Sequence, residues 1–289
     1  MSAPIPNHIL TILQGKPPTR NWKKLSECQR VIKHSPEGGW YQAVAVNNEN
    51  LLAVTDGLNK CVHLLTKDGT LVRSIGKGVL GGSLLGVAFD LKGSVWVTDS
   101  ANDKVVKLSQ NGQLVNNVQH AGSEDACFHN PTGVSVSYDG LIYICDCDNH
   151  RITVHDVEGN FLNAFGCKGK GPGCFDGPTD VAFGSDGLMY ATDVGNNRVC
   201  VWSKVGTLKQ AFKPNCAIAC IAATGDNHLL ITSHDSNIVM VYTLDGQLIH
   251  LVGGYGFQPG RFSRCWGICI DTSGLVYVAD CFNKRVQVF

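Results

Sequence analysis

One short pattern is repeated along the chain, and it constrains the fold more than any other feature. In its clearest form it reads LMYATDVGNNRVCVW over residues 188–202. An apolar run ends in Asp193, a polar turn follows, and an alternating apolar run begins at Arg198. Further copies, from close to degraded, cover residues 275–289, 141–155, 94–108, 51–65 and 229–242. A chain with six such copies is a repeat protein.

The spacing and composition of the copies select the class of repeat. The Asp of the pattern recurs after 43, 47, 47, 40 and 47 residues, with Ser233 in its place in the fifth copy. Periods of this length occur in paired-helix repeats and in four-stranded propeller blades. Here short runs of Val, Ile, Tyr and Trp alternate with Gly, Asp and Asn, which favours strands joined by tight turns over helices. The sequence therefore predicts an all-β fold, a six-bladed β-propeller of four-stranded antiparallel blades.

The two ends of the chain are predicted to meet in one blade. The last copy stops at Phe289 after three expected strands, so its sheet lacks an outer strand. Residues 28–34, CQRVIKH, have the pattern of an outer strand and precede the first expected inner strand, residues 41–46. We expect this N-terminal strand to complete the last blade, because an open seam would leave an unpaired strand edge.

The repeats also set the expected domain organisation. We expect residues 1–24 to form an N-terminal tail and residues 25–289 to form one propeller domain, with its second and third strands in the six copies. Within the tail, residues 9–13 are apolar enough to add a strand or to pack beneath the propeller, and a flexible tail is the alternative.

Charge and hydropathy limit the classes of partner. With 24 basic and 24 acidic residues the formal net charge is zero, so neither DNA nor an anionic membrane is expected as a dominant partner, although a local basic patch remains open. No run of apolar residues is long enough to span a bilayer. The first residues do not have the pattern of a secretory signal, and we expect a cytoplasmic protein.

The thirteen cysteines are expected to be reduced, structural residues. Their number is odd and no Cys-x-x-Cys pair occurs, so neither a full disulfide framework nor a zinc knuckle is predicted. Cys145 and Cys147, like Cys265 and Cys269, share one face of an expected strand, and a metal or redox pair is the alternative there. Cysteine is, however, among the residues most often buried. We expect no metal and no cofactor.

The repeated pattern resembles the NHL repeat. It reads apolar-Tyr-Val-Ala/Thr-Asp-x-x-Asn-x-Arg-Val-x-Val-Phe/Trp and is preceded in the fourth copy by Pro-Thr-Asp-Val-Ala, residues 178–182. The closest copies place both charged residues at the family positions: Asp146 and Arg151, Asp193 and Arg198, Asp280 and Arg285. The other three copies depart from it, with Cys61 and Lys104 at the Arg position and Ser233 with Ile238 in the fifth copy.

The chain as a whole is similar to the C-terminal propellers of tripartite-motif (TRIM-NHL) proteins. That resemblance implies a recognition module, which in TRIM-NHL proteins stands beside zinc-binding RING and B-box domains and a coiled coil. The first thirty residues hold one cysteine, Cys28, so they cannot supply the paired ligands of a RING. Ubiquitin-ligase activity is therefore implied only for longer relatives or a longer product. NHL propellers bind RNA hairpins or proteins, and some relatives are lyases or lactonase-like enzymes, so fold alone does not decide the function.

The repeated Asp and Arg residues have a structural interpretation and a catalytic one. Each pair is separated by five residues across one hairpin and recurs once per blade, where Asp can accept turn amides and the Arg guanidinium. A catalytic site in a repeat protein is expected at a departure from the repeat, so we interpret these pairs as structural. The histidines show no metal-ligand spacing, and Asp90, Asp180 and Asp271 of the inner strands are too few to predict a metal site.

The expected binding surface is the face that carries the inter-blade links and the turns between second and third strands. Loops on a fixed scaffold commonly carry recognition. The candidate residues on this face are Lys60, Lys77, His150, Lys168, Lys170, Lys213, Tyr255, Phe257, Arg261, Arg264, Phe282 and Lys284. Basic groups can contact phosphates and aromatic rings can stack on bases, but acidic residues such as Asp176 lie among them and suit a protein partner equally well.

These observations predict a non-catalytic recognition scaffold that binds a protein partner through the inter-blade loop face. The first alternative is an RNA-hairpin reader that uses the same face in post-transcriptional regulation. The second alternative is a metal-dependent lyase or lactonase-like enzyme. The partner and the oligomeric state do not follow from the sequence.

Overall fold

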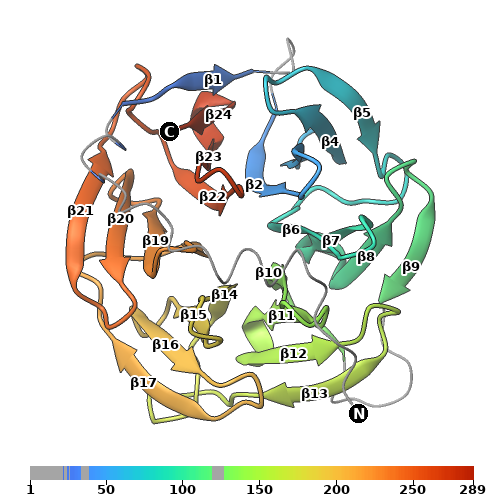
Figure 1. Cartoon of the computed structure of the whole chain (residues 1–289). Coiled ribbons are helices and arrows are strands. Elements are labelled where there is room, and N and C mark those ends of the chain that lie inside the picture. The colour runs from blue at the N-terminus through green and yellow to red at the C-terminus, as the bar shows by residue number, and fades with distance from the viewer. Residues whose placement is uncertain (1–21, 23–24, 26, 34–38, 119–126) are drawn as a thin grey trace.

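The computed structural model describes residues 22, 25, 27–33, 39–118 and 127–289. Within them the chain forms six four-stranded antiparallel sheets arranged around a common axis, and Figure 1 shows these blades in sequence order around the ring. Residues 9–13, for which the sequence leaves two alternatives, lie outside the described residues.

Five blades are built from consecutive strands, each running from the inner strand beside the axis to the outer rim. Blades 1 and 2 contain β2 (Tyr41–Val46), β3 (Leu51–Asp56), β4 (Cys61–Thr66), β5 (Leu71–Ile75), β6 (Gly86–Phe89), β7 (Val95–Asp99), β8 (Lys104–Leu108) and β9 (Leu114–Val118). Blades 3 and 4 contain β10 (Pro131–Val136), β11 (Ile142–Asp146), β12 (Arg151–His155), β13 (Phe161–Phe165), β14 (Pro178–Phe183), β15 (Met189–Asp193), β16 (Arg198–Trp202) and β17 (Leu208–Phe212). Blade 5 contains β18 (Ile221–Ala223), β19 (His228–Ser233), β20 (Ile238–Thr243) and β21 (Leu248–Gly253).

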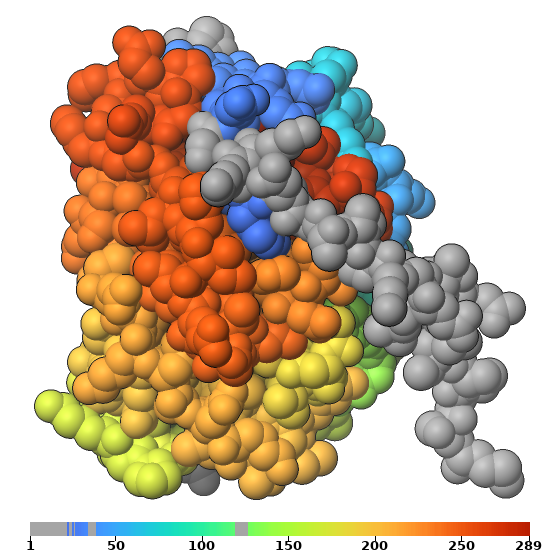
Figure 2. Space-filling view, turned by 60° about the vertical axis from the view of Figure 1, so that its left-hand side comes forward, coloured from blue at the N-terminus to red at the C-terminus, as the bar shows by residue number. Residues whose placement is uncertain are grey.

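The sixth blade joins the two ends of the chain and confirms the predicted closure. It contains β22 (Cys265–Ile270), β23 (Val276–Asp280) and β24 (Arg285–Val288), with β1 (Arg30–Ile32) as its outer strand. Arg30, Val31 and Ile32 pair with Val288, Gln287 and Val286 in antiparallel register. In Figure 2 the blue N-terminal segment lies directly against the orange-red C-terminal blade. The predicted strand over residues 28–34 is thus present but shorter.

Buried aromatic residues fill the spaces between neighbouring blades. Phe175 precedes blade 4 and stacks on Trp202 with ring centroids 5.3 Å apart. Phe262 precedes blade 6 and packs at a tilt against Phe289, with ring centroids 5.7 Å apart. Both phenylalanines are fully buried. Burying a side chain of this size contributes roughly 2 kcal/mol. Each apolar cluster joins two neighbouring blades, so the ring is stabilised blade by blade.

Two residues near the expected tail are also part of the core. Trp22 and Leu25 are buried and belong to the apolar cluster shared by blades 5 and 6. The Trp22 ring meets the His228 ring edge-on at a centroid distance of 4.9 Å. Trp22 falls within residues 1–24, so this part of the expected tail packs against the propeller.

Candidate partner-binding face

The inter-blade links and the turns between second and third strands lie on one face of the ring, which we call the loop face. Side-chain contacts join the two kinds of loop. Asn196, in the turn of blade 4, donates a hydrogen bond to the carbonyl of Gly169 in the preceding link, at 2.9 Å. Asn283 in blade 6 donates to the carbonyl of Gly256 in the same way, at 3.0 Å. The loops therefore form one connected surface.

The repeated Asp and Arg residues lie beneath the loop face and hydrogen-bond to its backbone. In blade 6 the fully buried Asp280 accepts Arg285 Nε at 2.6 Å and Asn283 Nδ2 at 2.8 Å, and its other oxygen accepts the amide of Ser263 at 2.7 Å. Arg285 then donates to three carbonyls of the preceding link, those of Phe257, Gln258 and Arg261. One ion pair thus connects the hairpin, its turn and the link before it.

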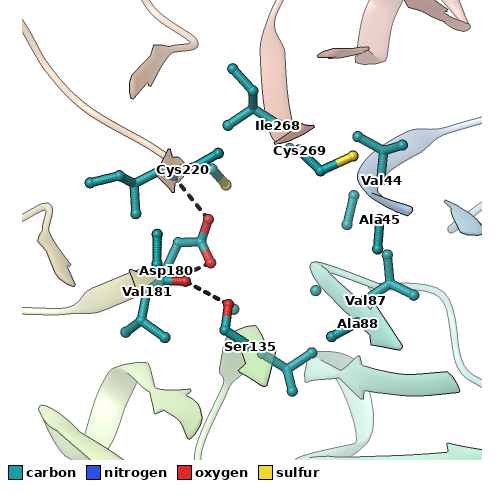
Figure 3. A pocket seen from close by; sticks show the side chains of 18 of the residues that line it. Val44, Ala45, Val87, Ala88, Ser135, Asp180, Val181, Cys220, Ile268 and Cys269 are labelled. Atoms are coloured by element: carbon teal, nitrogen blue, oxygen red, sulfur yellow. Dashed lines mark hydrogen bonds between the residues drawn. The ribbon is translucent and has the colours of Figure 1, made fainter. Parts of the chain in front are cut away.

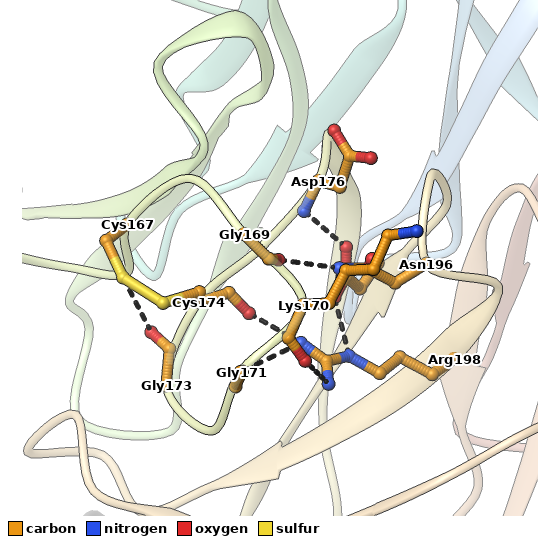
Figure 4. Close-up of a disulfide and its surroundings, with 10 residues drawn as sticks. Cys167, Gly169, Lys170, Gly171, Gly173, Cys174, Asp176, Asn196 and Arg198 are labelled. Carbon is orange, nitrogen blue, oxygen red and sulfur yellow. Dashed lines mark hydrogen bonds and ion pairs between the residues drawn. A yellow bond between two sulfur atoms is a disulfide. The ribbon is translucent and has the colours of Figure 1, made fainter.

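Blade 4 repeats this arrangement residue for residue. Asp193 accepts Arg198 Nε at 2.7 Å, and Arg198 donates to the carbonyls of Lys170, Gly171 and Cys174. Figure 4 shows the arginine beneath the link, with the three carbonyls directed at its guanidinium. Blade 3 has the same pair, with Arg151 Nε 2.8 Å from Asp146. These charges are used within the scaffold, where they order the loop backbone.

The degraded copies replace the arginine in different ways. Blade 1 has Cys61 at the Arg position, and Asp56 instead accepts a hydrogen bond from Nε2 of His63 at 3.0 Å. In blade 2 Lys104 lies 3.6 Å from Asp99 and donates to the carbonyl of Val79. Blade 5, with Ser233 and Ile238 in place of the pair, still forms four strands, so neither charge is required for a blade to form.

One cysteine pair corrects the expectation of reduced thiols. Cys167 and Cys174 form a disulfide across the glycine-rich link before blade 4 (Figure 4). The other eleven cysteines, all within the described residues, are free. Burial raises the pKa of Cys200 and of Cys265 to about 12, so these thiols are protonated. The sequence offered one signal for the disulfide, since both cysteines flank the same short Lys-Gly-Lys-Gly-Pro-Gly segment.

The structure brings together half of the candidate binding residues on the loops of blade 6. We define the blade-6 patch as Tyr255, Phe257, Arg261, Arg264, Phe282 and Lys284. Tyr255 and Phe257 are each 68% exposed with ring centroids 5.8 Å apart, and Phe282 is 51% exposed. The Arg264 guanidinium lies over the Phe282 ring at 5.4 Å. Residues 253–264 and 281–284 contain no acidic residue, so the patch is basic although the whole chain is neutral.

The remaining candidates are spread around the ring. Lys168 and Lys170 are exposed on the disulfide-closed link, and His150 lies partly buried beside it, 3.7 Å from Asp176. Lys60, Lys77 and Lys213 are exposed on three separate loops. Sequence analysis did not single out two residues at the inner edge of the patch: Trp266, whose ring lies 5.8 Å from the Arg264 guanidinium, and His234, 4.8 Å from that ring.

Comparison with known proteins shows the class to which these repeats belong. The family model described as NHL repeat matches residues 128–154 and 262–289, which include the third and sixth copies. The chain therefore contains two segments that match NHL repeats within a six-bladed β-propeller, and it resembles the propellers of TRIM-NHL proteins.

Two curated proteins match short segments of the chain. The E3 ubiquitin-protein ligase TRIM71 of Xenopus tropicalis is 49% identical over 37 residues, which is 13% of this chain and 4% of that protein. Protein wech of Drosophila melanogaster is 53% identical over 34 residues, which is 12% of this chain and 4% of that protein. The matched segments thus span only a small part of the relatives' length.

Solved structures share the fold at low sequence identity. A virginiamycin B lyase from Staphylococcus aureus has a TM-score of 0.67 at 16% identity, covering 90% of this chain and 97% of its own. A gluconolactonase from Xanthomonas campestris has a TM-score of 0.69 at 15% identity, covering 93% of both chains. A chain of the nidogen/laminin complex has a TM-score of 0.67 at 18% identity, covering 84% of this chain and 86% of its own. These likenesses concern the fold alone.

Two features of the described residues bear on other classes of site. No group of three or more His, Cys, Asp or Glu side chains there is placed to hold a metal ion. No helix in that part of the chain is long and apolar enough to cross a membrane.

Proposed function

We propose that this propeller is a non-catalytic recognition scaffold that binds a protein partner on its loop face, centred on the blade-6 patch. The observation that carries the proposal is the set of three aromatic side chains, each more than half exposed, on loops whose backbone is held by a buried arginine. Exposed aromatic residues with a neighbouring Arg are typical of interface hot spots. A held backbone reduces the ordering cost of binding.

The charge of the patch indicates the chemistry of the partner. Arg261, Arg264 and Lys284 surround the aromatic rings with no acidic residue in the same loops. A protein segment with carboxylates beside apolar or aromatic residues complements this surface, because the potentials are opposite and the rings supply apolar contact. By its resemblance to TRIM-NHL propellers, this surface would select partners for a ubiquitin-ligase-type protein. We propose a cytoplasmic location: the eleven free thiols are compatible with its redox state, whereas the Cys167–Cys174 disulfide would there be open to reduction.

The test is a quantitative comparison of bound proteins between matched variants of the full chain. Tyr255→Ala with Phe257→Ala removes the exposed rings of the patch, whereas Leu91→Ser with Val205→Ser changes exposed apolar residues elsewhere. We expect a partner, once purified, to bind the first variant at least about tenfold more weakly and the second variant unchanged. Equal binding to both variants would contradict the proposal.

RNA-hairpin binding is the second candidate, because exposed aromatic rings and cationic groups on loops that hold no acidic residue also suit unpaired bases and phosphates. Arg261→Glu with Arg264→Glu should then abolish selection from a random RNA pool, and the affinity of the unchanged protein should fall steeply with salt. If no sequence is enriched, or if affinity is insensitive to salt, RNA binding is excluded. The lyase or lactonase alternative has only the likeness of fold in its favour.

A further inference from the structure

The six inner strands enclose a channel along the axis of the ring, seen in Figure 3. Its volume is about 300 Å³, and residues of all six blades line it. Most of the lining consists of Val, Ile, Ala and Gly, and it includes no Lys, Arg or His. Its polar side chains are Ser135, Asp180, Cys220 and Cys269. The channel is therefore an apolar tube with a single carboxyl group.

Asp180 is a departure from the repeat. The other blades have a small residue at the same position of the inner strand: Ala43, Gly86, Gly133, Cys220 and Gly267. At Gly267 an added Cβ would lie 2.7 Å from the Cα of Ala43, so the next blade excludes a side chain there. Asp180 is accommodated because β18 in the next blade begins only at Ile221, whose amide donates to Asp180 Oδ2 at 3.0 Å. Such a departure is where a repeat scaffold acquires a site.

Among the described residues, the carboxyl group has amide donors but no cationic partner in the channel. Its second oxygen accepts the amide of Val181 at 2.9 Å. The thiols of Cys220 and Cys145 interact with it, and burial raises the pKa of both, so they are neutral. Burial also raises the pKa of Asp180 to about 7. Once ionised, Asp180 carries a charge that no cationic side chain of the described channel lining compensates, which is costly in an apolar environment.

We propose that the channel binds a small organic ammonium ion, with its charged head at Asp180 and its apolar body against the Val and Ile side chains of the inner strands. A charge-assisted hydrogen bond to a carboxylate is among the strongest available. The lining provides apolar contact for a short alkyl or aryl group, including Val44, Val87 and Ile268 around the same opening as Asp180 (Figure 3). This inference does not rest on the partner proposed for the loop face.

The surroundings favour an organic cation over a metal ion. Calcium and magnesium require six or more oxygen ligands, whereas the channel lining offers one carboxylate and one hydroxyl, and Ser135 Oγ already donates to the carbonyl of Val181. An ammonium group carries one positive charge, which one carboxylate neutralises, and its alkyl stem tolerates apolar walls. An anion is disfavoured because the lining holds no positive side chain.

The experiment is a titration of the full chain with n-butylammonium, followed by amide chemical shifts. We expect saturable shifts at Val181 and Ile221, with an affinity that increases between pH 6 and pH 8 as Asp180 ionises. n-Butanol and butyrate, which have the same alkyl chain without the positive charge, should bind at least about tenfold more weakly.

Two variants separate the carboxylate from charge in general. Asp180→Asn should bind n-butylammonium about tenfold more weakly and lose the pH dependence. Asp148→Asn changes an exposed carboxylate on the loop face by the same charge and should bind normally. Unchanged binding by Asp180→Asn, or equal shifts with n-butanol, would overturn the proposal. Shifts at the same amides with calcium chloride alone would overturn it in favour of a metal site.

Discussion

Blade 4 and blade 6 share one framework and differ in how they close the link that precedes them. In both, a buried Asp holds an Arg that donates to three carbonyls of the link. Blade 4 then joins Cys167 to Cys174, whereas in blade 6 the corresponding residues are Gly254 and Arg261, and Arg261 Nη1 donates to the carbonyl of Gly253 at 2.7 Å. A covalent closure and a hydrogen-bonded closure thus occupy the same place in the repeat.

The difference shows that the residues that fix the link backbone can stay the same while the exposed side chains of the link change. In blade 6 the link is closed by a side chain of the surface itself, and exposed aromatic residues, Tyr255 and Phe257, surround it. In blade 4 the link is closed by the disulfide and exposes Lys168 and Lys170, with the partly exposed Asp176 at its end. The same backbone therefore presents an aromatic and basic surface at one blade and a charged surface without exposed aromatic residues at the other.

The largest effect on stability is expected from removing the arginine of blade 6. The Arg285 side chain is 4% exposed against 14% for Arg198, so Arg285→Ala removes a buried, charged donor from Asp280 and from three link carbonyls. We expect Arg285→Ala to lower the free energy of unfolding by about 3 kcal/mol. Arg198→Ala should cost about half as much, because water reaches its site and the disulfide still closes the link. Urea unfolding measures both, and equal losses would mean that the disulfide does not support the link.

The disulfide itself is expected to have the next largest effect. Cys167→Ser with Cys174→Ser should lower the free energy of unfolding by about 2 kcal/mol, because the closed loop no longer restricts the unfolded chain. Cys167→Gly with Cys174→Arg transfers the residues of blade 6 to blade 4 and should recover part of that loss. The comparison is made by urea unfolding without reductant. If the transferred pair is no more stable than the serine pair, the two closures are not interchangeable.

A smaller and pH-dependent effect is expected at Asp180. Its pKa is about 7 in the folded protein against 3.8 for an ordinary carboxyl, so the folded state retains the proton that the unfolded state loses. Stability from this group is complete below about pH 4 and is lost as the pH rises to about 7. Asp180→Asn should therefore melt at the same temperature as the unchanged protein near pH 4 and a few degrees higher at pH 8. A difference in melting temperature that does not change with pH would show that burial does not perturb this carboxyl.

Most of the fold could be predicted from the sequence because the same strand and turn patterns recur in each repeat. The predicted inner strand of residues 41–46 is β2, and the expected Val-rich strand over residues 198–202 is β16. The N-terminal strand was predicted by counting strands per blade. The last repeat supplies only three strands before Phe289, so the fourth strand of its blade must come from another part of the chain. Each of these inferences used alternation and turn residues, which are properties of a single segment.

The site was less predictable because it depends on contacts between segments. Phe282 lies under Arg264 because the β23–β24 turn packs against the link that precedes blade 6, where Asn283 donates to the carbonyl of Gly256. The disulfide depends on the sharp return of the 166–177 link, which places Cys167 and Cys174 with Cα atoms 4.4 Å apart. Asp180 was recognisable as an inner-strand carboxylate, but its lack of a cationic partner was visible only once all six strands were in place.

The closure of the ring by β1 has a consequence for the order in which the blades can form during synthesis. Residues Arg30–Ile32 are made before the other strands of the ring, and the strand with which they pair, β24, is made after all of them. Blades 1 to 5 can each pair their own four strands as they emerge, whereas β1 stays unpaired while the strands between it and β24 are made. Formation of the sixth blade is then the step that closes the ring.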